Sequence, residues 1–160
     1  MSQVQGLTGL LNWGNDKLAY SDTASNLYLN ILDNTGVRTD PYLQTLPEKC
    51  VWSKLDTKIL YCAVPRNLPN GNYPDNWYQG TVSFEDRFWK INSETGQSER
   101  IQTRILEEVP VDAINLILSP DEQYLFFTNK KDYSLWSLRL FEKIEVEENT
   151  EETATTTEGN

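Results

Sequence analysis

Residues 117–127, Ile-Leu-Ser-Pro-Asp-Glu-Gln-Tyr-Leu-Phe-Phe, decide the fold class of this chain. Apolar residues stand on both sides of a short polar segment, Ser119–Gln123, which carries the proline and aspartate typical of tight turns. This arrangement predicts two antiparallel strands joined as a hairpin. Residues 135–138, Leu-Trp-Ser-Leu, follow with apolar residues two apart, which predicts a third strand with one buried face.

The hairpin pattern occurs twice more, at residues 10–20 and 50–61. In each of the three units we align one residue before the turn and one residue after it. On this alignment the first turn is two residues shorter than the other two. The aligned residues are Trp13, Trp52 and Leu118 before the turn, and Tyr20, Tyr61 and Phe127 after it. We expect the tryptophans of this pattern to lie in the core, together with Trp89 and Trp136.

Each hairpin is followed by a third strand and, in the first two units, by a short polar fourth strand. Residues 28–36 and 88–96 both end in Thr-Gly, which suits a turn. The third strands align Leu29, Trp89 and Trp136 at one position, and Ile31, Ile91 and Leu138 at another. The polar segments at 37–39 and 98–103 are typical of an outer edge strand.

Four antiparallel strands, repeated, are the blade of a β-propeller. The separation of Trp13 and Trp52, 39 residues, is close to the ~40–45 of WD40-type blades. The sequence therefore predicts an all-β fold: a partial β-propeller of about three four-stranded antiparallel blades within residues 1–143. We place the blades at 7–46, 47–108 and 109–143, with a loop insertion at 65–86 in the second.

The motif Ser-Pro-Asp-Glu at 119–122, with the strand and the Trp136 segment after it, resembles the WD40-like repeat of TolB-type propellers. That family repeats a Ser-Pro-Asp-Gly turn, and Glu122 stands where the family usually has glycine, a departure that a type I turn tolerates. The resemblance covers roughly residues 7–141. It implies a propeller, and a parent protein of the cell envelope or another extracytoplasmic place, but no particular ligand, because one scaffold hosts many activities.

Three blades do not close a ring of the four to eight that propellers have. Each end therefore leaves an apolar blade face uncovered. We expect this chain to be the C-terminal portion of a longer propeller, whose remaining blades cover those faces. The alternative is a second copy of the chain, two copies making six blades.

The net charge of −10 lies largely in a tail at residues 144–160, which carries six glutamates and no basic residue. A glutamate- and threonine-rich segment with few apolar residues is expected to be disordered. An acidic chain without basic stripes does not fit nucleic acid or an anionic membrane surface as its partner. It also contains no stretch long and apolar enough to span a membrane.

The residue types argue against catalysis within this chain. It has no histidine, which removes the commonest general base and metal ligand, and it lacks the common nucleophile and phosphate-binding motifs. We expect no catalytic residue, no metal and no cofactor.

Cys50 and Cys62 are equidistant from Asp56, so a turn centred there places them opposite each other on neighbouring strands. They are then within reach of a disulfide, which would indicate an oxidising compartment, and the alternative is two buried thiols.

The insertion is the candidate binding segment. Its first part, residues 65–80, contains three prolines among asparagines and glycines, which argues against a regular helix or a central strand. Binding residues concentrate on such loops. The candidates are Tyr73, Asp75, Trp77, Tyr78 and Gln79. Trp77 and Tyr78 can stack on a sugar ring or a peptide, whereas the alternative is that Tyr73 and Trp77 fix the loop onto the blade as a small local core.

These observations predict a non-enzymatic binding or scaffold module that interacts with a protein or a glycan. The alternative is an accessory propeller of a larger hydrolase, similar to prolyl-oligopeptidase-like enzymes, with catalysis outside this chain.

Overall fold

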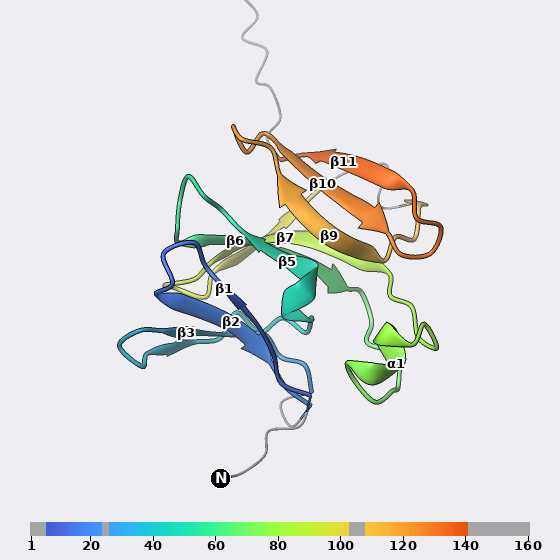
Figure 1. The fold of residues 1–160 in the computed structure, drawn as a ribbon, viewed down its shortest axis with the longest axis horizontal. Helices are drawn as coiled ribbons and strands as arrows, with labels where there is room; N and C mark the ends of the chain where they lie inside the picture. The colour runs from blue at the N-terminus through green and yellow to red at the C-terminus, as the bar shows by residue number, and fades with distance from the viewer. Residues whose placement is uncertain (1–5, 24–25, 103–107, 141–160) are drawn as a thin grey trace, which may run out of the picture.

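The computed structural model describes residues 6–23, 26–102 and 108–140, and these form three antiparallel β-sheets (Figure 1). The first sheet contains β1 (Thr8–Leu11), β2 (Lys17–Ser21), β3 (Asn30–Asp33) and β4 (Arg38–Thr39). The second contains β5 (Cys50–Trp52), β6 (Ile59–Pro65), β7 (Asp86–Asn92) and β8 (Ser98–Ile101). The third contains β9 (Ala113–Leu118), β10 (Tyr124–Asn129) and β11 (Leu135–Arg139).

In every sheet, strands that follow each other in the chain are neighbours, so each sheet is a simple meander. The predicted all-β class and the series of antiparallel sheets are confirmed. Each sheet is shaped like a blade and falls inside one predicted unit, which is compatible with a propeller. The third sheet has three strands among the described residues, and the predicted tail at 144–160 lies outside them.

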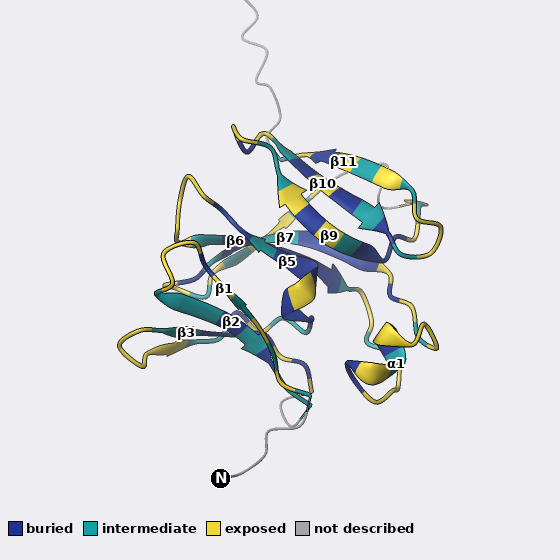
Figure 2. Cartoon of the chain, in the orientation of Figure 1, coloured by how far each residue is buried: buried dark blue, intermediate teal, exposed yellow. Residues whose placement is uncertain are grey.

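The second sheet lies between the other two. Its Trp52, Leu60 and Ile91 pack against Ala19 and Ile31 of the first sheet. Its opposite face packs on the third sheet, where the rings of Phe88 and Phe127 have centroids 4.8 Å apart. Figure 2 shows the resulting concentration of buried residues on β5, β6 and β7.

The alignment of the three hairpins needs a correction at Trp13. The backbone N–H of Asn12 and that of Ser119 each donate to the carbonyl of the residue five positions later. The backbone N–H of Ser53 donates to the carbonyl of the residue six positions later. The first and third turns are therefore equal in length and the second is one residue longer. Leu11, and not Trp13, occupies the position of Trp52 and Leu118.

Trp13 lies in the turn itself, where 61% of it is exposed and the Lys54 ammonium stands 4.1 Å above its ring. The prediction that it is core was wrong, because a tryptophan beside a turn sequence was counted as a strand residue. Three other alignments are also shifted by one residue. Asn30, and not Leu29, matches Trp89 and Trp136. Leu32, and not Ile31, matches Ile91 and Leu138, and Cys62, and not Tyr61, matches Phe127.

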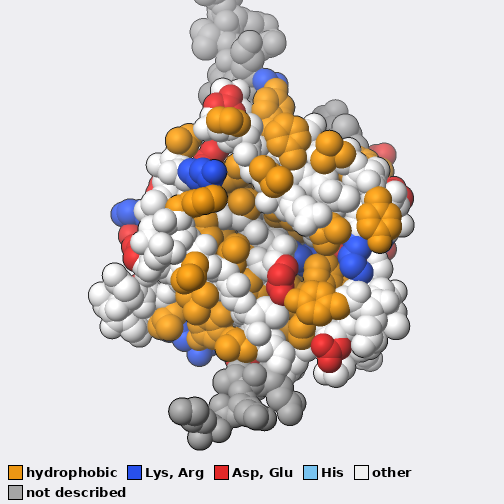
Figure 3. All heavy atoms as spheres, viewed as in Figure 1, with side chains coloured by type: hydrophobic (Ala, Val, Ile, Leu, Met, Phe, Trp, Pro, Cys, Tyr) orange, Lys and Arg blue, Asp and Glu red, His pale blue; other side chains and the backbone are white. Residues whose placement is uncertain are grey.

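The outer faces of the first and third sheets retain exposed apolar side chains. Leu11 is 58% exposed on the first sheet and Ile117 is 62% exposed on the third. Phe126 lies between Leu125 and Phe127, which face the second sheet, so its ring points the other way. Figure 3 shows hydrophobic side chains gathered over the region of β1 and β2 and again over the third sheet.

Candidate functional site

The insertion after β6 folds onto the rest of the molecule around a short helix, α1 (Asp75–Tyr78), seen in green in Figure 1. The prediction that this segment has no helix was wrong for this one turn. Pro74 immediately precedes the helix, where a missing N–H costs no intrahelical hydrogen bond, so it favours the turn instead of breaking it.

A fully buried lysine holds the insertion in place. Lys49 ends the 3₁₀ helix η1 (Pro47–Lys49), and its Nζ lies 2.7 Å from Asp112 Oδ1 and 2.8 Å from Asp86 Oδ2. It also donates to the Ala113 carbonyl at 2.8 Å. Asp86 begins β7 and Asp112 precedes β9, so this one ammonium joins the second sheet to the third.

Asp112 extends the same network to the helix of the insertion. The indole Nε1 of Trp77 donates to both of its carboxylate oxygens at 3.1 Å, and the backbone N–H of Phe84 donates at 3.0 Å. The Lys49 ammonium also lies over the Trp77 ring, 5.0 Å from its centroid. Lys130 Nζ donates to the Trp77 carbonyl at 2.6 Å. Trp77 is therefore fixed from three sides.

The two aspartates respond differently to this setting. Burial raises the pKa of Asp86 above its ordinary value, since the opposing charge of Lys49 does not fully compensate, and its Oδ1 accepts no hydrogen bond from the described residues. Burial acts on Asp112 in the same direction, but the charge of Lys49 and the hydrogen bonds to the carboxylate outweigh it. The pKa of Asp112 is therefore lowered.

Sequence reasoning missed Lys49, Asp86 and Asp112. The available signal was that Asp86 begins an apolar strand of the second unit and Asp112 directly precedes an apolar strand of the third. No spacing in the sequence links Lys49 to them, because the bond to Asp112 joins residues 63 positions apart.

The predicted binding residues divide into a buried and an exposed group. Tyr73 and Trp77 are 7% and 4% exposed and pack with Leu27, Leu46 and Phe84. Trp77 therefore offers no stacking platform to a ligand, and the packing alternative describes both residues. Asp75, Tyr78 and Gln79 are exposed, and the Tyr78 hydroxyl donates to a Glu48 carboxylate oxygen.

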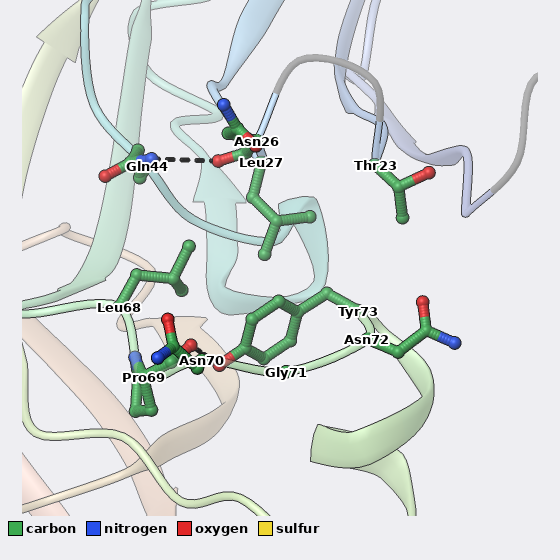
Figure 4. Close-up of a pocket in the computed structure, with 10 residues that line it drawn as sticks. All are labelled: Thr23, Asn26, Leu27, Gln44, Leu68, Pro69, Asn70, Gly71, Asn72 and Tyr73. Carbon is green, nitrogen blue, oxygen red and sulfur yellow. Dashed lines mark hydrogen bonds between the residues drawn. The ribbon is translucent and has the colours of Figure 1, made fainter.

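A pocket of about 480 Å³ opens beside the insertion, within the usual range for small-molecule sites (Figure 4). The segment 68–73 lines it on one side, and residues of the segments that follow β2 and β4 line it on the other. Four of its residues carry side-chain amides: Asn26, Gln44, Asn70 and Asn72. The ten described residues that line it include no charged one.

The pocket has an apolar floor under polar walls. Leu27 and Tyr73 belong to the core cluster under the insertion, with Leu68 packed against it. The Tyr73 hydroxyl donates to the Pro69 carbonyl at 2.5 Å, which ties the two ends of the 69–73 loop together. Gln44 Nε2 donates to the Asn26 carbonyl at 2.9 Å, drawn as a dashed line in Figure 4. Side-chain amides over an apolar base suit an uncharged ligand that both donates and accepts hydrogen bonds.

The two cysteines form a disulfide. Cys50 and Cys62 pair directly across β5 and β6, and their Cα atoms are 4.1 Å apart. The bond lies in the core between the first and second sheets.

Searches of protein-family models and of curated proteins find no match to this chain. Within the described ranges, no helix has the length and hydropathy that a membrane span requires. Nor do three or more His, Cys, Asp or Glu side chains come together there as a metal site.

Proposed function

We propose that this protein is a non-enzymatic binding module, related in architecture to a β-propeller, that binds an uncharged glycan in the pocket beside its insertion. The observation that carries the proposal is the lining of that pocket: four side-chain amides over Leu27, Leu68 and Tyr73, with no charged residue among those described. Sugar hydroxyls need both donors and acceptors, which an amide supplies together. The disulfide is consistent with an oxidising compartment, where glycans are abundant.

The test is titration of the ¹⁵N-labelled chain with neutral oligosaccharides, followed by NMR. We expect shifts confined to residues around the pocket, and Asn72→Ala should weaken binding about tenfold, the effect of losing one or two hydrogen bonds. The substitution keeps the fold, because Asn72 anchors the loop through its backbone N–H, which bonds to Asn76 Oδ1. Asn34→Ala, in the exposed turn after β3, is the matched control. Shifts produced by a peptide and not by any oligosaccharide would redirect the proposal to a protein ligand.

We propose also that a second copy of the chain covers the outer faces of the first and third sheets. The first sheet presents Leu11 and Leu18, which correspond to Trp52 and Leu60 in the internal interface. The third presents Phe126, which corresponds to Tyr61, a residue on the face of the second sheet that packs on the third. The chain already makes this kind of sheet-to-sheet contact twice, between the first and second sheets and between the second and third. The two outer faces match the two sides of that contact.

Light scattering should give twice the mass of one chain, and Phe126→Asp should return the single-chain mass. A wild-type mass of one chain would overturn the second copy and favour further blades of a longer protein.

A further inference from the structure

A second pocket, of about 350 Å³, lies next to the first and has different chemistry. Its lining includes three arginines, Arg66, Arg87 and Arg100, and the ten described residues around it include no acidic one. This is notable in a chain with a net charge of −10. Gln44 lines both pockets, so they share a wall.

The sheet register explains how the arginines come together. Trp89 on β7 pairs with Arg100 on β8, and Arg87 lies two residues before Trp89, on the same face of the sheet. Arg66 follows the last residue of β6, and its backbone N–H bonds to the Glu85 carbonyl just before β7. Three arginines from separate segments thereby line one hollow.

Arg87 makes the pocket a preformed one. Its residue is 8% exposed, and its Nη1 donates to the Asp86 carbonyl at 3.0 Å, which fixes the guanidinium in the wall. The opposite wall carries Tyr28 and Tyr42, of which Tyr42 is 80% exposed with a left-handed backbone, φ +57°.

We infer that this second pocket is an anion subsite that takes the carboxylate of an acidic sugar, in a glycan whose uncharged part lies in the first pocket. The inference rests on the proposed function. Guanidinium groups bind carboxylates through paired charge-assisted hydrogen bonds, and the tyrosines and Trp89 offer apolar faces to the ring that carries the carboxylate. The ligand class is therefore a uronate-containing oligosaccharide.

The test compares tetragalacturonate with its methyl ester, which has the same backbone without the negative charges, by calorimetry on the full chain at low salt. We expect the acid to bind at least tenfold more tightly than the ester. Arg66→Ala with Arg100→Ala should abolish the difference; both residues are exposed, so the fold should persist. Arg66→Lys with Arg100→Lys should restore part of it. Arg38→Ala, an exposed arginine of β4, is the control and should change nothing. Equal binding of acid and ester would overturn the inference while leaving the proposed function standing.

A second measurement separates the two proposals. Citrate is titrated into the ¹⁵N-labelled chain, and we expect shifts centred on Arg66, Arg100 and Tyr42. If neither oligosaccharide binds but citrate produces these shifts in an arginine-dependent way, the anion subsite stands and the glycan function fails. If citrate produces no such shifts and the acid shows no preference, the subsite is overturned.

Discussion

The carboxylate of Glu122 accepts the hydroxyl hydrogen of Ser53 with an Oε2–Oγ distance of 2.6 Å, although the two residues lie 69 positions apart. Its other oxygen accepts the backbone N–H groups of Lys54 at 2.6 Å and Leu55 at 3.2 Å. The turn of the third sheet is thus joined to the corresponding turn of the second. Glu122 has φ +52°, a region that favours glycine, so its side chain is retained there at the cost of backbone strain.

Glu122→Ala should lower the free energy of unfolding by about 1–3 kcal/mol, because three donors lose a shared, buried acceptor. Glu122→Gly loses the same bonds but relieves the left-handed strain, so it should be about 1 kcal/mol more stable than the alanine variant. Chemical denaturation measures both. Gln123→Ala, at the exposed neighbouring position, is the control. A glycine variant less stable than the alanine variant would contradict the assignment.

Lys49→Met should cost about 3–5 kcal/mol of unfolding free energy, because it leaves Asp86 and Asp112 buried without their cation. The unfolding free energy is measured by chemical denaturation, and Lys58→Met, measured in the same way, is the matched control. Lys58 pairs with Glu94 at 2.9 Å on the exposed surface, and its loss should leave the melting temperature unchanged. Adding Asp86→Asn and Asp112→Asn to Lys49→Met should recover part of the stability. No recovery would mean that packing, and not the unpaired charges, causes the loss.

Trp77→Ala should cost about 3–5 kcal/mol, as expected for removing a buried tryptophan. Trp13→Ala is the control and should cost only about 0.5–1 kcal/mol. Trp13 is exposed, and its contact with the Lys54 ammonium is an interaction of that size at such sites. Urea denaturation of the two variants gives the comparison. Equal, small effects would show that Trp77 is available at the surface after all.

Tyr61 makes stability sensitive to alkaline pH. Burial, with the nearby charges of Glu122 and Asp56, raises the pKa of Tyr61 to about 12 from an ordinary value of 10.0. Between these two values the unfolded chain loses the phenolic proton while the folded chain keeps it. The stabilisation is therefore complete below pH 10 and is lost as the pH rises towards 12.

Denaturation at a series of alkaline pH values should show this decline, and Tyr61→Phe should make it shallower. Some decline should persist in the variant, because burial also raises the pKa of Tyr73 and of Tyr78. An identical slope in the wild type and Tyr61→Phe would exclude Tyr61 as a cause.

The sequence by itself determined the local structure of this protein. Alternating apolar residues and polar turns predicted the hairpins, since a strand's side-chain period and a turn's backbone angles are properties of a few adjacent residues. The opposition of Cys50 and Cys62 followed from the same local geometry. The errors were local too: one extra residue in the β5–β6 turn shifted the alignment of Tyr61, and Trp13 was placed in a strand instead of the turn.

Only the tertiary structure decided the contacts between sheets and the two pockets. Lys49 meets Asp112 across 63 residues, and the arginines gather because β6, β7 and β8 lie side by side. A lysine, an aspartate or an arginine has no sequence period that reveals such a partner. Burial gives Lys49 and Asp112 their roles, and that burial arises only when the sheets stack.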